Sequence, residues 1–104
     1  MQNKKNQLSL AAMGRHAAKA EAVLKHMANA NRLMILCRLV EGEETVGELV
    51  QGVGLSQSAV SQHLIKMKAA KLVISEKRGQ QVFYSLASAD VTAILKTLHQ
   101  IYCS

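Results

Sequence analysis

The spacing of apolar residues changes once along this chain, near residue 72, and that change constrains the fold more than any other feature. Before it, apolar residues recur every three or four positions, which is the period of an amphipathic helix. After it, apolar and polar residues alternate through 72–77 and again through 82–86, as they do in strands. Arg78 and Gly79 lie between the two alternating runs. The sequence therefore predicts helices followed by a β-hairpin.

Two helices are expected in the first forty residues. The first spans roughly residues 9–27 and carries one apolar stripe, which faces either the core or a second subunit. The second begins after Asn29 or Asn31 and is apolar on nearly every side, as a buried helix is. The stripe of the first helix consists of Leu10, Met13, Ala17, Ala20, Leu24 and Met27.

Three more helices are marked by hydroxyl residues that can cap their first turn. Thr45 begins a short helix, with Glu48 at the position that completes a capping box. Ser56 begins another, over 57–70, and Ser88 begins the last one, after the hairpin. The predicted fold class is mainly α with a small β-hairpin, in the order ααααββα.

A chain of 104 residues has room for one domain, which we expect over residues 8–104, behind a polar and disordered tail at 1–7. Because 49% of the residues are hydrophobic and 3% are aromatic, the core must be aliphatic. The sequence has neither an apolar run long enough to span a membrane nor a secretory signal. These features predict a cytoplasmic protein with no membrane partner.

The region from Thr45 to His63 fits a helix-turn-helix, because Leu49, Val53, Leu55 and Val60 have the required offsets around Gly54. The second helix has a small, polar outer face without acidic residues, which suits close approach to the major groove. The residues expected to contact DNA are Ser56, Gln57, Ser58, Ser61, Gln62, His63 and Lys66 in this helix, and Lys77 and Arg78 at the hairpin tip. A half-buried structural role is the alternative for His63.

The charge distribution also favours a polyanionic partner. The formal net charge is +6, and it is segregated along the chain. Residues 63–81 hold five lysines and arginines against a single glutamate, whereas residues 41–48 hold four glutamates and no basic residue. This arrangement is typical of a protein that binds double-stranded DNA.

The run LSQSAVSQHLIKMKAAKLVISEKRGQQVFYSL, residues 55–86, resembles the ArsR family of winged-helix repressors. The likeness extends over about residues 20–103. It implies a winged helix-turn-helix, a homodimer joined through the first and last helices, and a transcription regulator that leaves its operator when an inducer binds.

The same resemblance narrows the inducer. Members that sense arsenic, cadmium or lead carry a C-x-C in the stretch that here reads TVGELV, which has no thiol. Zinc-type members carry Asp-x-His near the start of the last helix, where this chain has Asp90 and Thr92. No metal site and no cofactor are therefore expected. Cys37 and Cys103 resemble the cysteine pair of the persulfide-sensing branch, the BigR-, SqrR- and HlyU-like regulators, although Cys37 alone could be an unreactive core residue.

Other functions stay open at this stage. The chain could be a non-sensing or antirepressor DNA-binding regulator, a metal-responsive repressor, or more distantly a winged helix that binds only proteins. An enzyme is not expected, because the sequence has no P-loop, no HExxH and no glycine-rich phosphate loop.

Overall fold

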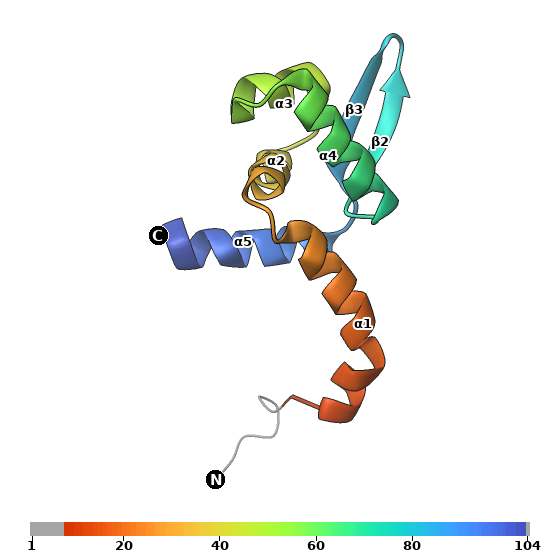
Figure 1. The fold of residues 1–104 in the computed structure, drawn as a ribbon, viewed down its shortest axis with the longest axis vertical. Coiled ribbons are helices and arrows are strands. Elements are labelled where there is room, and N and C mark those ends of the chain that lie inside the picture. Colours follow the sequence, from red (N-terminus) through yellow and green to blue (C-terminus); the bar gives the residue numbers. More distant parts are fainter. Residues whose placement is uncertain (1–7, 104) are drawn as a thin grey trace.

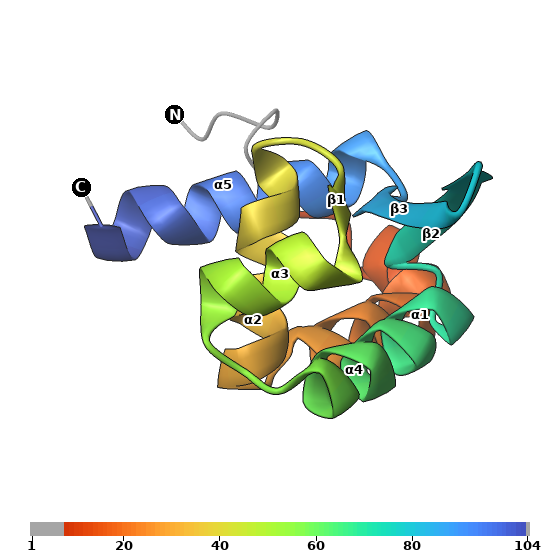
Figure 2. The same cartoon turned by 90° about the horizontal axis from the view of Figure 1, so that it is seen from above.

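The computed structural model describes residues 8–103, so the predicted tail at 1–7 lies outside the described residues. Within them the predicted order of helices and hairpin is confirmed (Figure 1), and a short additional strand, labelled β1 in Figure 2, joins the hairpin. The helices are α1 (Leu10–Met27), α2 (Ala30–Val40), α3 (Val46–Val53), α4 (Gln57–Ala69) and α5 (Ala89–Cys103). The strands are β1 (Glu44–Thr45), β2 (Val73–Arg78) and β3 (Gln81–Leu86).

Side-chain caps begin the helices where the sequence predicts. Asn29 caps α2, its Oδ1 accepting a hydrogen bond of 3.1 Å from a backbone amide of the first turn. Thr45 and Glu48 form a complete capping box at α3, and Ser56 caps α4. The Ser88 hydroxyl accepts from the amide of Val91 at 3.3 Å, in the first turn of α5. Each cap satisfies an amide that has no partner inside its helix.

The sheet has the order β1-β3-β2, with both neighbours of β3 antiparallel to it. The hairpin pairs Ser75 with Tyr84, and β1 pairs Thr45 with Phe83. Two residues are too few to show an alternating pattern, which is why the sequence did not reveal β1. This strand ties the segment between α2 and α3 to the hairpin, which forms the wing.

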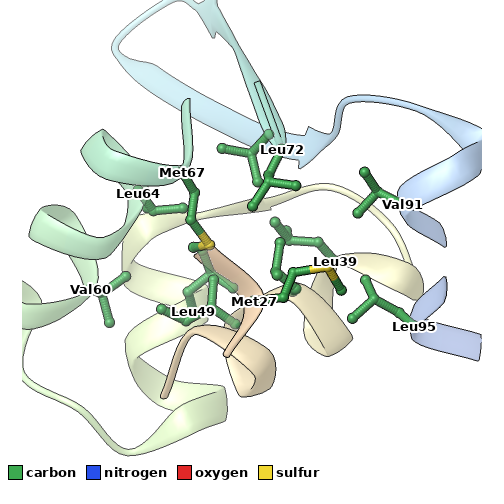
Figure 3. Close-up of a cluster of buried hydrophobic side chains, with 12 residues drawn as sticks. Met27, Leu39, Leu49, Val60, Leu64, Met67, Leu72, Val91 and Leu95 are labelled. Atoms are coloured by element: carbon green, nitrogen blue, oxygen red, sulfur yellow. The ribbon is translucent and has the colours of Figure 1, made fainter. Parts of the chain in front are cut away.

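The core is aliphatic, as expected, and draws on all five helices and β2 (Figure 3). The α2 residues Ile35, Leu36 and Leu39 belong to it, whereas Met34 is 52% exposed, so α2 is buried on one face and not, as its apolar pattern predicts, on nearly every side. Around them are Met27, Leu49, Val60, Leu64, Met67, Leu72, Val73, Val91 and Leu95.

Helices α1 and α5 extend away from this core (Figure 1). Of the α1 stripe only Met27 is buried, whereas Leu10, Met13 and Leu24 are at least half exposed. On α5, the apolar residues beyond the core contact are exposed as well, with Tyr102 at 80%. The α1 stripe therefore does not serve mainly as a core face within one chain, whereas Val91 and Leu95 of α5 are buried and only the C-terminal end of that helix is exposed. No helix of the described residues is long and apolar enough to cross a membrane.

Candidate DNA-binding surface and thiol pocket

Helix α4 has one buried face and one outward face. Val60, Leu64 and Met67 are fully buried in the core. Because successive residues of an α-helix are rotated by about 100°, Ser58 and Gln62 lie on the opposite side, and both are exposed. Ser61 lies at the edge of this outward face and is half-buried. In both views of the molecule α4 lies on the side remote from α5 (Figure 2).

The N-terminus of α4 is arranged to receive an anion. The Ser56 Oγ accepts a hydrogen bond of 3.1 Å from the amide of Ala59, and its own proton remains available for donation. Gln57 and Ser58 follow in the first turn, exposed, where the partial positive charge of the helix is concentrated. Lys66 is exposed farther along α4, and α4 contains no acidic residue. A phosphate group suits this end of the helix.

His63 joins α4 to α2. Its Nδ1 accepts a hydrogen bond of 3.2 Å from Nε of Arg32, and another nitrogen of that guanidinium lies 3.4 Å from Nδ1 of His26. Burial lowers the pKa of His63, and the positive charges of Arg32 and Lys66 lower it further. The ring is therefore held neutral and half-buried, which favours the structural alternative for this residue.

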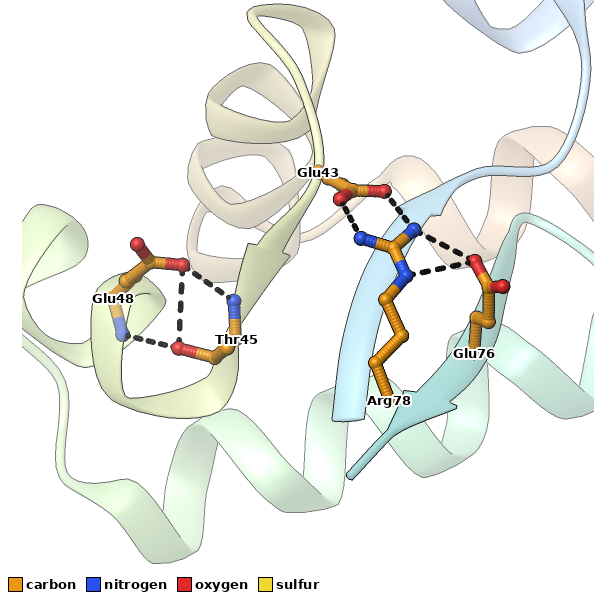
Figure 4. Close-up of polar contacts among 5 residues, drawn as sticks. All are labelled: Glu43, Thr45, Glu48, Glu76 and Arg78. Carbon is orange, nitrogen blue, oxygen red and sulfur yellow. Dashed lines mark hydrogen bonds and ion pairs between the residues drawn. The ribbon is translucent and has the colours of Figure 1, made fainter. Parts of the chain in front are cut away.

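Two carboxylates hold Arg78 at the tip of the wing (Figure 4). Nη2 of Arg78 donates to Oε1 of Glu43 at 2.7 Å, and Nη1 contacts Oε2 of the same carboxylate. Oε1 of Glu76 accepts from Nη2 at 2.7 Å and from Nε at 3.2 Å. The guanidinium carbon also lies 4.7 Å from the centre of the Phe83 ring. Hydrogen bonds from Arg78 lower the pKa of Glu43, and those to Glu43 and then Glu76 raise the pKa of Arg78. Lys77 is exposed beside it.

Two further contacts, which the sequence did not point to, hold the surface in place. The Lys68 ammonium donates to Oγ of Ser75 at 2.6 Å and so connects α4 to β2. Arg38 donates from Nε to Glu44 at 3.0 Å, which connects α2 to β1. The residues of each pair are at least six positions apart, so the sequence contains the polar side chains but does not indicate which of them interact.

The two cysteines lie on helices that pack together. Cys37 on α2 is half-buried and lines a cleft of about 240 Å³ with Leu95, Lys96 and His99 of α5. Burial raises the pKa of the Cys37 thiol, and the negative charge of the Cys103 thiolate raises it further.

Cys103 is the last described residue of α5 and is exposed. It follows His99 by four positions, so both lie on the same face of the helix. Each cysteine is a free thiol in the structure. Among residues 8–103, no group of three or more histidine, cysteine and acidic residues is placed to hold a metal ion.

Comparison with known proteins gives consistent matches. Residues 29–75 match the family described as bacterial regulatory protein, arsR family. The transcriptional activator HlyU of Vibrio cholerae is 47% identical over 96 residues, covering 92% of this chain and 89% of the relative. The crystal structure of the transcriptional repressor BigR from Xylella fastidiosa superposes with a TM-score of 0.87 at 33% identity, covering 93% of this chain and 99% of that one.

A more distant structure bears on assembly. The homodimeric winged helix-turn-helix DNA-binding domain of Mb0332 from Mycobacterium bovis, solved in solution, has a TM-score of 0.77 at 26% identity. It covers 92% of this chain and 87% of that domain. These relatives are transcriptional regulators and not enzymes, as expected from the sequence.

Proposed function

The chain belongs to the ArsR family of DNA-binding transcriptional regulators, and from this premise we propose that it is a homodimeric repressor that releases its operator when Cys37 and Cys103 react with persulfide. The single observation that carries the DNA-binding part is the outward face of α4, which is exposed, mostly polar and free of acidic residues and adjoins a wing with an exposed Lys77. That surface suits direct reading of bases in the major groove.

In this proposal α4 determines sequence specificity through base contacts, and the wing contributes affinity through contacts with the DNA backbone. Ser58, Ser61 and Gln62 are the candidates for base contacts, while Ser56, Gln57 and Lys66 contact phosphates. Lys77 contacts the backbone from the wing. Arg78 holds the wing against the β1 segment through Glu43 and reaches DNA only if that ion pair opens. His63 acts through Arg32, by fixing α4 on α2.

A homodimer explains the exposed apolar stripes of α1 and α5. Within residues 8–103, nothing buries the exposed apolar side chains of these two helices. They are Leu10, Met13 and Leu24 on α1, and Ile101 and Tyr102 on α5. Apolar surface of this extent is stabilised by association with a second copy. A two-fold dimer presents two copies of α4, so its operator is an imperfect inverted repeat with half-sites about one helical turn apart.

The proposed sensing reaction needs no oxidant besides the persulfide. The Cys103 thiolate attacks the outer sulfur of an organic persulfide RSSH, which forms Cys103–S–SH and releases RS⁻. The Cys37 thiolate then attacks Sγ of Cys103, the inner sulfur of that persulfide, which forms a Cys37–Cys103 disulfide and breaks the bond to the outer sulfur, releasing HS⁻. If both cysteines are first converted to persulfides, the same displacement at an inner sulfur gives a trisulfide and HS⁻.

The link would join α2 to the dimerisation helix α5. Both helices share one core with α3 and α4, so a change in their packing alters the spacing of the two recognition helices in the dimer. Binding is then weakened although no DNA-facing residue has changed.

The experiment begins with selection of DNA from a random library, followed by binding titrations over a range of salt concentrations. We expect an inverted repeat and steeply salt-dependent affinity. Ser58→Ala and Gln62→Ala should each change the preferred sequence, by about 1–3 kcal/mol for a lost base contact. Failure to enrich any sequence, with no salt-dependent binding, would favour a winged helix that binds proteins instead.

The sensing step is tested with the single variants Cys37→Ser and Cys103→Ser. Each should bind the operator normally and stay bound when organic persulfide is added, whereas the unsubstituted protein is released. Intact mass distinguishes the two products. Relative to the reduced protein, a disulfide lacks two hydrogens, whereas a trisulfide lacks two hydrogens and contains one additional sulfur. The matching thiol RSH, which has no transferable sulfur, serves as the control reagent. Release of both variants by persulfide would show that the cysteines are not the sensor.

The relatives also support a second regulatory outcome, which is activation of transcription. HlyU is described as an activator and BigR as a repressor, and this chain is similar to both. A regulator of this kind can also raise transcription by displacing another repressor from overlapping DNA. A reporter driven by the selected operator in cells lacking the gene separates the two outcomes by the sign of the change.

A further inference from the structure

One side chain on the outward face of α4 is not polar. Ile65 is 63% exposed and lies outside the core cluster. It follows Gln62 by three positions and Ser61 by four, so these three side chains are neighbours on the helix surface. On the opposite side of the helix Met67 is fully buried. Ile65 therefore lies within the surface assigned to DNA, surrounded by groups suited to base contacts.

We propose that Ile65 is a specificity-determining residue that recognises a thymine through its C5-methyl group in the major groove. This inference rests on the proposed DNA-binding function of α4. The thymine methyl is the one apolar group among the base edges exposed in that groove. The other edges carry hydrogen-bond donors and acceptors, which an aliphatic side chain would desolvate without pairing.

Charge and composition favour DNA as the partner of this side chain over a second protein. The helix around Ile65 carries Lys66 and Lys68 and no acidic residue, and the chain has a net charge of +6. The apolar stripes assigned to the dimer are on α1 and α5, and α4 lies on the side remote from α5. Ile65 is thus an isolated apolar group on a basic, polar surface.

The helix geometry also gives the approximate position of the thymine. Ile65 lies seven residues after Ser58, which corresponds to about 10 Å along the helix axis at about 1.5 Å per residue. With base pairs spaced about 3.4 Å apart, this distance equals roughly three base-pair steps. The recognised thymine should therefore lie about three base pairs from the base contacted by Ser58.

The test is a double-mutant cycle between protein and DNA. Each thymine of the selected half-site is replaced in turn by deoxyuridine, which removes only the methyl group, and affinity is measured by fluorescence anisotropy at fixed salt. We expect one position at which the unsubstituted protein loses about fourfold in affinity, the effect of burying one methyl group. Ile65→Ala should bind thymine and deoxyuridine equally well there.

Ile74→Ala is the matched control, because Ile74 on β2 is the same residue type and is 53% exposed. It should distinguish thymine from deoxyuridine as the unsubstituted protein does. If Ile65→Ala keeps the full discrimination at every thymine, the inference is wrong, even though sequence-specific binding itself persists. If the unsubstituted protein itself shows no salt-dependent binding to the selected DNA, the proposed function of α4 is wrong. Thermal unfolding of Ile65→Ala confirms that its fold is intact.

Discussion

Nε of Arg32, in the first turn of α2, donates a hydrogen bond of 3.2 Å to Nδ1 of His63 in α4. A guanidinium only donates, so His63 must be the acceptor, and its neutral ring carries the proton on Nε2. Protonation of Nδ1 would remove the acceptor and place two positive charges side by side. The polar contact between α2 and α4 is therefore coupled to the protonation state of His63.

The first prediction is a loss of stability in mild acid. Because the pKa of His63 is lowered in the folded state, its contribution is present above about pH 6.5, the ordinary value for histidine, and is lost as the pH falls through the folded pKa. Urea unfolding at fixed protein concentration between pH 5 and 8 measures it. His63→Gln keeps an acceptor for Arg32 but does not titrate, so its stability should fall less below pH 6.5.

His16→Gln is the control for this series, because His16 is an exposed histidine of α1. It should follow the unsubstituted protein at every pH. If the His63→Gln profile runs parallel to that of the unsubstituted protein, the acid sensitivity arises elsewhere.

The second prediction separates the two basic residues of the wing. Lys77→Ala should weaken binding to all sequences alike and reduce the salt dependence by about one unit of slope, the effect of one lost phosphate contact. Arg78→Ala should also weaken all sequences alike, but with little change in slope, because its charge is already paired with Glu43 and Glu76. Lys19→Ala, on α1, should change neither quantity. An Arg78→Ala slope change equal to that of Lys77→Ala would mean that Arg78 leaves Glu43 to contact phosphate in the complex.

The wing also illustrates what could and could not be predicted from the sequence. The helices, their caps and the hairpin follow from local rules, since Thr45 and Glu48 or Ser56 and Ala59 interact over three positions. Glu43 and Arg78 interact over 35 positions, and nothing in the pattern of charges specifies which pairs form in the folded chain. For that reason Arg78 was predicted as a DNA contact without its ion pairs.

The recognition surface was predictable to a greater extent. The polar residues of α4 were found because their spacing and type are informative without tertiary contacts. The spacing of Ile65 from Gln62 places it on the same face, but the sequence alone does not single it out, because an apolar residue in a helix is usually a core residue. Only the exposure of its side chain in the folded chain shows otherwise.

The third prediction concerns the packing of α2 against α3. A Cβ on Gly52 would collide with the guanidinium of Arg38, the side chain that also pairs with Glu44. Gly52→Ala should therefore displace the flexible Arg38 side chain from Glu44, at a cost of up to about 1 kcal/mol for a partly exposed ion pair. In the Arg38→Ala background the same substitution should be neutral or stabilising. Urea unfolding of the four proteins measures the coupling.

Gly47→Ala is the matched control in the same helix. Its added Cβ would meet its nearest neighbour, the Thr45 hydroxyl, at 3.9 Å, which is an ordinary contact, so we expect a gain of about 0.4–1 kcal/mol. Equal stabilities for Gly52→Ala and the unsubstituted protein would mean that Arg38 moves aside without cost.

The fourth prediction is that zinc does not release the operator. Asp90 lies in the first turn of α5, where a negative charge is favourable without any metal, and Thr92 supplies no nitrogen ligand. Addition of stoichiometric zinc should leave the binding isotherm unchanged. Thr92→His, which restores the Asp-x-His spacing, is the informative variant and should gain zinc affinity. Tight zinc binding by the unsubstituted protein, accompanied by release of DNA, would contradict this assignment.

The fifth prediction is the order in which the two thiols react. The thiolate is the nucleophile, and the raised pKa of Cys37 keeps that residue protonated where an ordinary thiol has begun to ionise. Cys103 is exposed and should therefore be alkylated first by iodoacetamide at neutral pH, with Cys37 following only at higher pH. Peptide mass mapping over a series of pH values measures both rates.

Cys103→Ser supplies the decisive comparison. The negative charge of Cys103 is one of the two causes that raise the pKa of Cys37, and burial is the larger cause. Removing that charge should shift the alkylation profile of Cys37 toward lower pH, yet leave it above the ordinary range because burial remains. The proposed chemistry requires this order, since the exposed thiol must capture the sulfur before the half-buried thiol displaces HS⁻. Faster alkylation of Cys37 than of Cys103 at neutral pH would reverse the roles of the two residues.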